Sequence, residues 1–139
     1  MTPPPAAELR SSCPVAASLD VLGDRWTLVV LRDLLLDGRT HFADFAADES
    51  IATNTLAERL QRLRDTGIIA RVRDAEDGRR WVYLPRRPAI DLIPILVDLM
   101  IWGSAHTAVE VPPELADASA HRDALVAQFT ERAETRLVD

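Results

Sequence analysis

Residues 53–84 read TNTLAERLQRLRDTGIIARVRDAEDGRRWVYL, and no other stretch says as much about the fold. Its leucines recur at steps of four and three residues, which places them on one face of a helix over 53–66 that Thr53 is positioned to cap. Two β-prone runs follow, and an Asp-Gly turn lies between them. The stretch therefore predicts an amphipathic helix followed by a β-hairpin over 68–84.

The segments on either side of this stretch have helical patterns. Helices are expected over 14–22, 25–36, a short segment that Thr40 caps, 90–105 and 119–136. Pro85 and Pro88 enclose a linker between the hairpin and the helix that follows it. A short helix, a turn, a second helix and a hairpin in this order are typical of a winged helix-turn-helix. We therefore predict a mainly α fold with a small β-hairpin, to which N- and C-terminal helices are added.

Charge is unevenly distributed along the chain. The whole chain has a net charge of −6, but residues 51–90 hold nine arginines against five acidic residues. All 16 basic residues are arginines, whose guanidinium groups suit bidentate contacts with phosphate and guanine. The composition of the genome also explains this uniform use of arginine. A basic segment between two acidic ones indicates a surface for nucleic acid, although any solvated hairpin or amphipathic helix can carry such charges.

Other functional classes find no support in the residue patterns. Cys13 is the single cysteine and the three histidines are too far apart for a metal site, so no cofactor or metal is expected. The sequence has no phosphate-binding loop, nucleophile elbow or pair of catalytic carboxylates, which argues against an enzyme. It also has no uninterrupted apolar run near the length of a membrane span and no signal-peptide pattern at its start. We therefore expect a cytoplasmic protein with no membrane partner.

Four segments, in order, resemble the HxlR family of bacterial winged-helix regulators. Residues 13–35, CPVAASLDVLGDRWTLVVLRDLL, are similar to the family's opening signature, in which CP precedes G-x-K/R-W and an apolar helix. The other three segments are FADFA at 42–46, TLAERLQRLRDTGI at 55–68 and LIPILVDLMIWG at 92–103. The resemblance covers about residues 13–105 and does not extend to the tail.

The resemblance implies a homodimer, related in architecture to the MarR class, that binds an inverted repeat in double-stranded DNA. Its added N- and C-terminal helices would be dimerisation helices, with 13–105 as the DNA-binding domain and 106–139 as a helical extension for dimerisation. Residues 1–12, rich in proline and serine, are expected to form a flexible arm. The two recognition helices, about 53–66, would enter successive major grooves roughly 34 Å apart, and the wing, about 68–84, would contact the adjacent backbone or minor groove. The residues expected at the DNA are Thr53, Asn54, Thr55, Glu58, Arg59, Arg62, Arg79 and Arg80.

The dimer surface has its own candidate residues. The apolar side chains of 90–105 offer more surface than one small domain easily covers, although the helix can also pack entirely on its own core. A cleft in the dimer would admit a small apolar effector, as in relatives with ligand pockets, or the same side chains simply fill the core. The residues concerned are Trp26, Phe42, Leu96, Leu99 and Trp102.

Cys13 is a candidate redox switch. It stands beside Pro14 at the start of a predicted helix, where the helix dipole favours the thiolate. Some members of the resembled family sense oxidants or electrophiles with a cysteine at this position. A lone cysteine is also compatible with a purely structural role.

The features together predict a dimeric, sequence-specific transcriptional regulator that a thiol modification or a small effector switches. The alternative is a winged-helix module that binds a protein partner without specific DNA binding, which the acidic outer segments would favour. The salt dependence of binding distinguishes the two functions. Binding through phosphates weakens steeply as the salt concentration rises, whereas binding through an apolar interface hardly responds. RNA binding fits less well, since no exposed aromatic platform for base stacking is evident.

Overall fold

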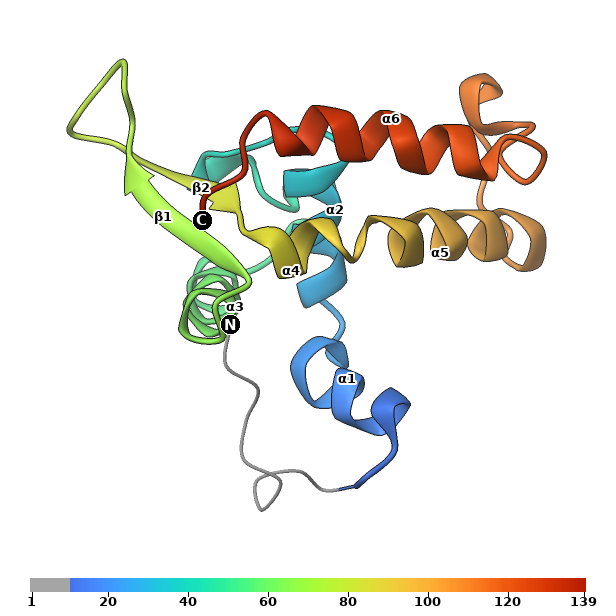
Figure 1. Ribbon diagram of the computed structural model, residues 1–139, viewed down its shortest axis with the longest axis horizontal. Coiled ribbons are helices and arrows are strands. Elements are labelled where there is room, and N and C mark those ends of the chain that lie inside the picture. The colour runs from blue at the N-terminus through green and yellow to red at the C-terminus, as the bar shows by residue number, and fades with distance from the viewer. Residues whose placement is uncertain (1–10) are drawn as a thin grey trace.

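The computed structural model describes residues 11–139 and has the predicted fold class, a mostly helical chain with a two-stranded antiparallel hairpin (Figure 1). In chain order the elements are α1 (Pro14–Leu22), α2 (Thr27–Leu35), the 3-10 turns η2 (Phe42–Asp44) and η3 (Ala47–Glu49), α3 (Thr53–Asp65), β1 (Ile69–Arg73), β2 (Trp81–Pro85), α4 (Arg87–Ile90), α5 (Ile93–His106), η4 (Pro113–Leu115) and α6 (Arg122–Glu134). Most of the predicted arm, residues 1–12, lies outside the described residues.

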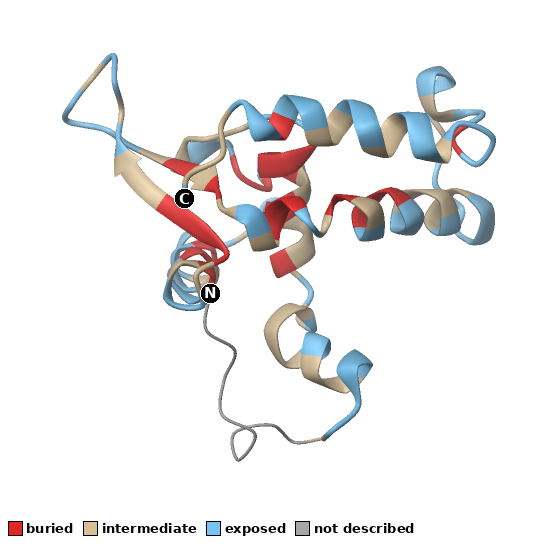
Figure 2. Ribbon diagram, in the orientation of Figure 1, coloured by how far each residue is buried: buried red, intermediate tan, exposed pale blue. Residues whose placement is uncertain are grey.

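α2 is the central element of the hydrophobic core (Figure 2). Its sequence, TLVVLRDLL, is apolar on nearly every side, and the helix buries six of its nine residues. Burial of one large aliphatic side chain stabilises a fold by about 1.5–3 kcal/mol, so this cluster holds the elements of the molecule together. The core partners from α3, β1, α4 and α5 include Leu56, Leu60, Leu63, Ile69, Ile90, Ile93 and Val97.

The hairpin is anchored at its base and projects from the helical body (Figure 1). β1 and β2 pair antiparallel, and residues 74–80 connect them. Within this connection the Arg80 N–H donates to the Asp77 carbonyl at 2.9 Å, which closes the predicted Asp-Gly turn. At the base, the Tyr83 N–H donates to the Thr40 carbonyl at 2.8 Å, so β2 is fixed to the segment that precedes α3.

The segment between α2 and α3 differs from the prediction. A short helix capped by Thr40 is expected, whereas the chain forms the two turns η2 and η3. Ala46, with φ 50°, and Ser50, with φ 57°, lie in the left-handed region that non-glycine residues seldom adopt, and these two conformations interrupt any continuous helix. α3 follows Ala52 and has no side-chain cap, so Thr53 is its first residue and the predicted cap is wrong.

The helices after the hairpin also differ in detail from the prediction. The expected linker around Pro88 is the short helix α4, whose first turn accommodates proline because the missing N–H has no partner there. The single helix expected over 90–105 is divided between α4 and α5. The last helix, expected over 119–136, is shorter than predicted at both ends.

α6 lies beside α5 and packs back onto its own domain (Figure 1). Ala133 of α6 is fully buried in the core. The guanidinium of Arg136 donates to the Leu34 carbonyl at 2.9 Å, which satisfies one of the carbonyls left free at the C-terminal end of α2. The Val138 N–H donates to the Pro85 carbonyl at 2.9 Å, so the tail also fixes the end of β2.

The helical stretch Arg87–His106, 20 residues long, has the length and composition of a membrane span. No such run is evident in the sequence, because prolines and aspartates interrupt the apolar residues. A core helix passes the same test, and Ile90, Ile93 and Val97 of this stretch are buried in the core cluster. Length and composition alone are therefore weak evidence for a span.

Candidate nucleic-acid interface

α3 turns its polar face to solvent beside the hairpin. Its leucines point into the core, and the exposed residues of its outer face include Thr53, Asn54, Glu58, Gln61 and Arg62. Amide, carboxylate and guanidinium groups of this kind can form hydrogen bonds with base edges in a major groove. Thr55, expected at the DNA, is half-buried. Gln61 was not predicted as a contact, although its spacing of three residues from Glu58 places it on the same face.

A groove with a volume of about 550 Å³ lies between α3 and the hairpin, and we call it the basic groove. Its lining includes Gln61 and Arg64 from α3, Arg71, Arg80 and Trp81 from the hairpin, and His41 and Phe42 from the segment before α3. Within residues 11–139, no carboxylate forms an ion pair with the three arginines that border it. The Arg64 guanidinium donates to the Gln61 side chain at 3.1 Å, and all three guanidinium groups can bind an anion such as a DNA phosphate.

Two arginines lie over the ring of Trp81 on one face of the hairpin. The guanidinium carbons of Arg73 and Arg71 lie 3.9 and 4.4 Å from the centroid of its ring, a cation–π arrangement. The register places Arg73 directly opposite Trp81, and Arg71 lies two residues along on the same face. The stack fixes the direction of Arg71 and hence one wall of the basic groove. The prediction omits Arg71 and Trp81 as DNA contacts, although the period of two in the strand is visible in the sequence.

Arg79 and Arg80, both expected at the DNA, lie in the loop that connects the strands. The side chain of Arg79 is 92% exposed and pairs with Asp77 at 3.2 Å, whereas Arg80 lines the basic groove. Asp74 pairs with His41 at 3.1 Å, and a backbone N–H of the loop together with this ring lowers the pKa of Asp74. The two carboxylates of this loop, Asp77 and Asp74, thus pair with Arg79 and His41, while Arg80 lies at the groove.

Arg59 and Arg62 face the turn between α1 and α2. The Arg59 Nε lies 3.0 Å from Asp24 Oδ1, and the Arg62 Nη1 lies 3.8 Å from Asp24 Oδ2. Arg59 also pairs with Glu58 at 2.8 Å, and its ion pair with Asp24 raises the pKa of its guanidinium. The side chain of Arg59 is 17% exposed, against 47% for Arg62. The structure thus leaves Arg62 open to solvent and holds Arg59 against the protein.

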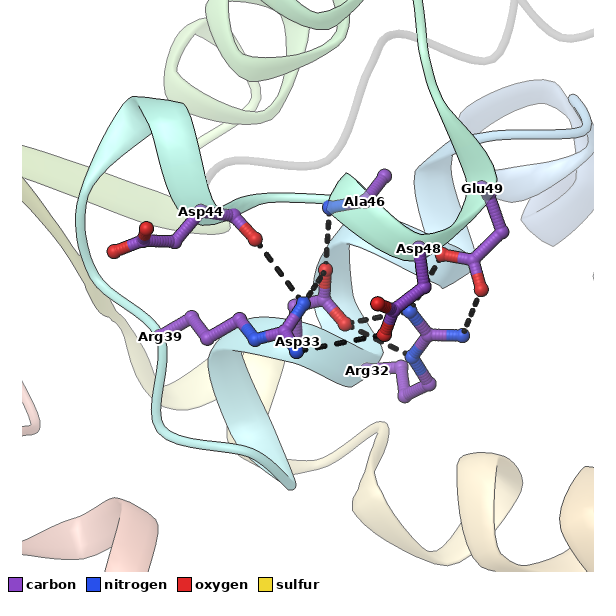
Figure 3. Close-up of polar contacts among 7 residues, drawn as sticks. All are labelled: Arg32, Asp33, Arg39, Asp44, Ala46, Asp48 and Glu49. Atoms are coloured by element: carbon purple, nitrogen blue, oxygen red, sulfur yellow. Dashed lines mark hydrogen bonds and ion pairs between the residues drawn. The ribbon is translucent and has the colours of Figure 1, made fainter.

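A buried polar network holds the segment that precedes α3 (Figure 3). Asp33 of α2 is fully buried and accepts a hydrogen bond from the N–H of Ala46. Arg32 pairs with Asp33 at 2.6 Å and with Glu49 at 2.8 Å, and Arg39 pairs with Asp33 at 3.4 Å. Burial of a carboxylate is costly unless it is paired and hydrogen-bonded in this way. The network therefore stabilises the left-handed conformation of Ala46 and, with it, the approach of the chain to α3.

Cys13 is exposed at the N-terminal end of α1. Hydrogen bonds from the backbone N–H groups of Ala16 and Val15 lower the pKa of its thiol. A lowered pKa increases the fraction of thiolate, the reactive form of cysteine. The position therefore has the exposure and the electrostatics that a reactive thiol requires.

The five residues expected at an effector pocket or dimer surface lie in different environments within the single chain. Phe42 lines the basic groove, whereas Leu96 and Leu99 line a separate cavity of about 230 Å³ against α2. Trp102 is 60% exposed and its ring centroid lies 5.0 Å from that of His106. Trp26 is half-buried directly before α2.

The chain is similar in sequence to known proteins. The model of the HxlR-like helix-turn-helix family matches residues 21–111. The chain is 34% identical over 92 residues to Rv3095 of Mycobacterium tuberculosis, an uncharacterized HTH-type transcriptional regulator, covering 66% of this chain and 58% of that relative. It thus spans less than two thirds of that relative's length. It is also 30% identical over 100 residues to sll1512 of Synechocystis, another HTH-type transcriptional regulator, covering 72% of this chain and 74% of the relative.

Two solved structures of candidate transcription factors are similar to this one. The crystal structure of PA1607 superposes with a TM-score of 0.67 and 34% identity, covering 76% of this chain and 75% of the other. PA1374 from Pseudomonas aeruginosa superposes with a TM-score of 0.51 and 28% identity, covering 75% and 74%. The matched segment contains α2, α3, the hairpin and α5. This chain belongs to the HxlR-like helix-turn-helix family of transcriptional regulators.

Proposed function

We propose that this protein is a homodimeric, sequence-specific DNA-binding regulator. The observation that carries the proposal is the basic groove, whose three arginines have no ion-pair partner within residues 11–139. A duplex that receives α3 in its major groove runs its backbone past the hairpin. Guanidinium groups suit that backbone because they donate paired hydrogen bonds to phosphate. Arg64, Arg71 and Arg80 then hold the backbone between the recognition helix and the wing.

In this complex the exposed face of α3 reads the bases. The residues at its N-terminal end that approach base edges and phosphates are Thr53, Asn54 and Thr55. The Asn54 amide suits adenine and the Glu58 carboxylate suits the amino group of cytosine, while Arg62 contacts a phosphate or a guanine. Arg79, whose side chain is 92% exposed, reaches the adjacent minor groove.

The proposed dimer contact lies on α1 and α5. Ile95, Leu99 and Trp102 recur at helical spacing and form an exposed apolar face, which we call the α5 stripe. α1 projects from the body (Figure 1) and buries none of its nine residues, with Val15 and Leu19 exposed. Two uncovered apolar helix faces offer a surface for a second copy. We assign the contact to α1 and α5 because α6 is partly occupied by its own domain.

Selection from a pool of random duplexes tests the proposal. Reduced full-length protein enriches duplexes over several rounds, and the enriched duplex and a scrambled one are then titrated by fluorescence anisotropy at two salt concentrations. We expect an inverted repeat to be enriched, with a slope of log affinity against log salt of about −0.9 per phosphate contact. A pool without enrichment, or binding that ignores salt, contradicts the proposal and favours a module that binds a protein partner.

A second candidate role is thiol sensing by Cys13, which its exposure and lowered pKa favour. Modification there would alter α1, one of the two helices assigned to the dimer contact. Cys13→Ser should leave DNA binding by the reduced protein unchanged and should abolish the response to hydrogen peroxide. A wild-type protein whose DNA binding does not respond to peroxide rules this role out.

A further inference from the structure

Asp24 lies in the turn between α1 and α2 and is bonded to the start of α2. Its Oδ1 accepts the backbone N–H of Trp26 at 2.8 Å and that of Thr27 at 3.0 Å, and its Oδ2 accepts the Thr27 hydroxyl. Asp24 thus supplies acceptors for N–H groups that the first turn of a helix leaves unpaired. These contacts fix the carboxylate relative to α2, the central core helix.

The same carboxylate reaches the recognition helix. Its Oδ1 pairs with Arg59 at 3.0 Å, while Arg62 is more distant at 3.8 Å. Partial burial raises the pKa of Asp24, but hydrogen bonds from Thr27 and from backbone N–H groups, together with the paired guanidinium of Arg59, outweigh it and lower the pKa to about 2. Asp24 is therefore ionised at neutral pH and ties α3 to α2 through a charged contact.

We infer that Asp24 is a positioning residue for DNA recognition: through Arg59 it sets the orientation of α3 relative to α2, and it thereby determines which bases α3 distinguishes. The inference rests on the proposed function and gives Arg59 a structural role in place of the expected DNA contact. Arg59 suits this role because its guanidinium meets Asp24 and Glu58, both within the chain. Arg62, which is more exposed, remains available to the DNA.

Asp24 influences DNA binding in two ways that have opposite signs. As a negative charge beside the recognition helix it repels phosphates, so its removal should strengthen binding to every duplex alike. As a positioning residue it improves the fit to one sequence, so its removal should weaken binding to that sequence relative to others. The ratio of the affinities for the enriched and the scrambled duplex therefore separates positioning from simple charge.

The test compares Asp24→Asn, Arg59→Gln and the double variant, each in the full chain, on the enriched duplex and on a scrambled duplex of the same composition. We expect each single variant to lower the affinity ratio about tenfold, a loss comparable to one mismatched base pair. The double variant should lower it no further, because both residues act through one contact. Asp24→Glu keeps the charge and should restore part of the ratio.

Two controls separate positioning from charge and from stability. Asp123→Asn removes the same charge on α6, where the side chain is 94% exposed, and should leave the ratio unchanged. Thermal unfolding of each variant establishes that the chain is folded at the titration temperature. Arg59→Gln leaves the hydrogen bonds at the start of α2 in place, so it tests the contact even if Asp24→Asn lowers stability.

The outcomes that overturn the inference are distinct from those that overturn the proposed function. If Asp24→Asn raises both affinities and leaves their ratio unchanged, Asp24 acts only as a charge and the inference is wrong. Additive effects of Asp24→Asn and Arg59→Gln on the ratio also contradict it. A wild-type protein that enriches no duplex overturns the proposed function, and the inference with it.

Discussion

The basic groove and the α5 stripe are both exposed, yet they present opposite chemistries. Arginines border the groove, whereas three large apolar side chains make up the stripe. The hairpin and the far end of α5 lie at opposite ends of the longest axis of the molecule (Figure 1). The chain thus separates its charged surface from its apolar one.

This difference indicates two kinds of partner. Guanidinium groups that stay hydrated gain most from a ligand with many phosphates, and that gain falls as salt rises. An apolar stripe gains from burial, which salt hardly changes. Substitutions in one surface should therefore alter one measurement and leave the other nearly intact, and the following experiments test that separation.

The largest effect, on the free energy of unfolding, is expected from substitution of Asp33, which belongs to neither surface. Asp33→Asn removes the buried charge between Arg32 and Arg39 and should lower the free energy of unfolding by about 3–5 kcal/mol. Urea denaturation measures this loss. Asp48→Asn is the matched control, because its ion pair with Arg39 is exposed and is worth at most about 1 kcal/mol. Equal losses in the two variants would show that the network does not hold the fold.

The next largest effect concerns the α5 stripe. Trp102→Glu should weaken dimerisation by about 2 kcal/mol, or roughly 30-fold, because an exposed tryptophan is a typical interface anchor. Sedimentation equilibrium of the wild type and the variant measures the change. Ala127→Glu, on the exposed side of α6, is the control and should leave the dimer intact. The assignment to α5 fails if only the control dissociates the dimer.

A smaller effect is expected in the basic groove. Arg80→Ala should reduce the slope of log affinity against log salt by about 1 and weaken the enriched and scrambled duplexes alike, because a phosphate contact carries no base information. Anisotropy titrations over a salt series measure the slope. Arg122→Ala removes an equal charge on α6, where Arg122 pairs with Asp98, and should not change it. An unchanged slope in Arg80→Ala would place the DNA backbone elsewhere.

The smallest effect is the pH dependence of the Asp24 contact. The pKa of Asp24 is about 2 in the folded chain, below the value of about 3.9 expected in the unfolded chain. Its contribution to stability is therefore complete above about pH 4 and is lost as the pH falls toward 2. The difference in Tm between wild type and Asp24→Asn should narrow over that range. A difference that stays constant between about pH 5 and pH 2 would contradict the lowered pKa.

Much of the fold follows from local patterns in the chain. The leucine spacing locates α3, and the Asp-Gly turn locates the hairpin, because helix and strand periods depend on neighbouring residues alone. The segment over 39–50 could not be predicted in this way. Its left-handed Ala46 depends on the carboxylate of Asp33, which lies on a different element, so a local pattern predicts a helix where the chain forms two turns.

The candidate DNA interface, like the fold, could be predicted from the sequence only in part. The excess of arginines over acidic residues in 51–90 identifies α3 and the hairpin as the basic part of the molecule before any contact is known. Which arginines are free to bind is a matter of long-range contacts: Asp24 engages Arg59, and α3 and the hairpin together form the groove around Arg71. Side-chain periodicity depends on neighbours in the chain, whereas ion pairs depend on neighbours in space, and only folding brings Asp24 and Arg59 together.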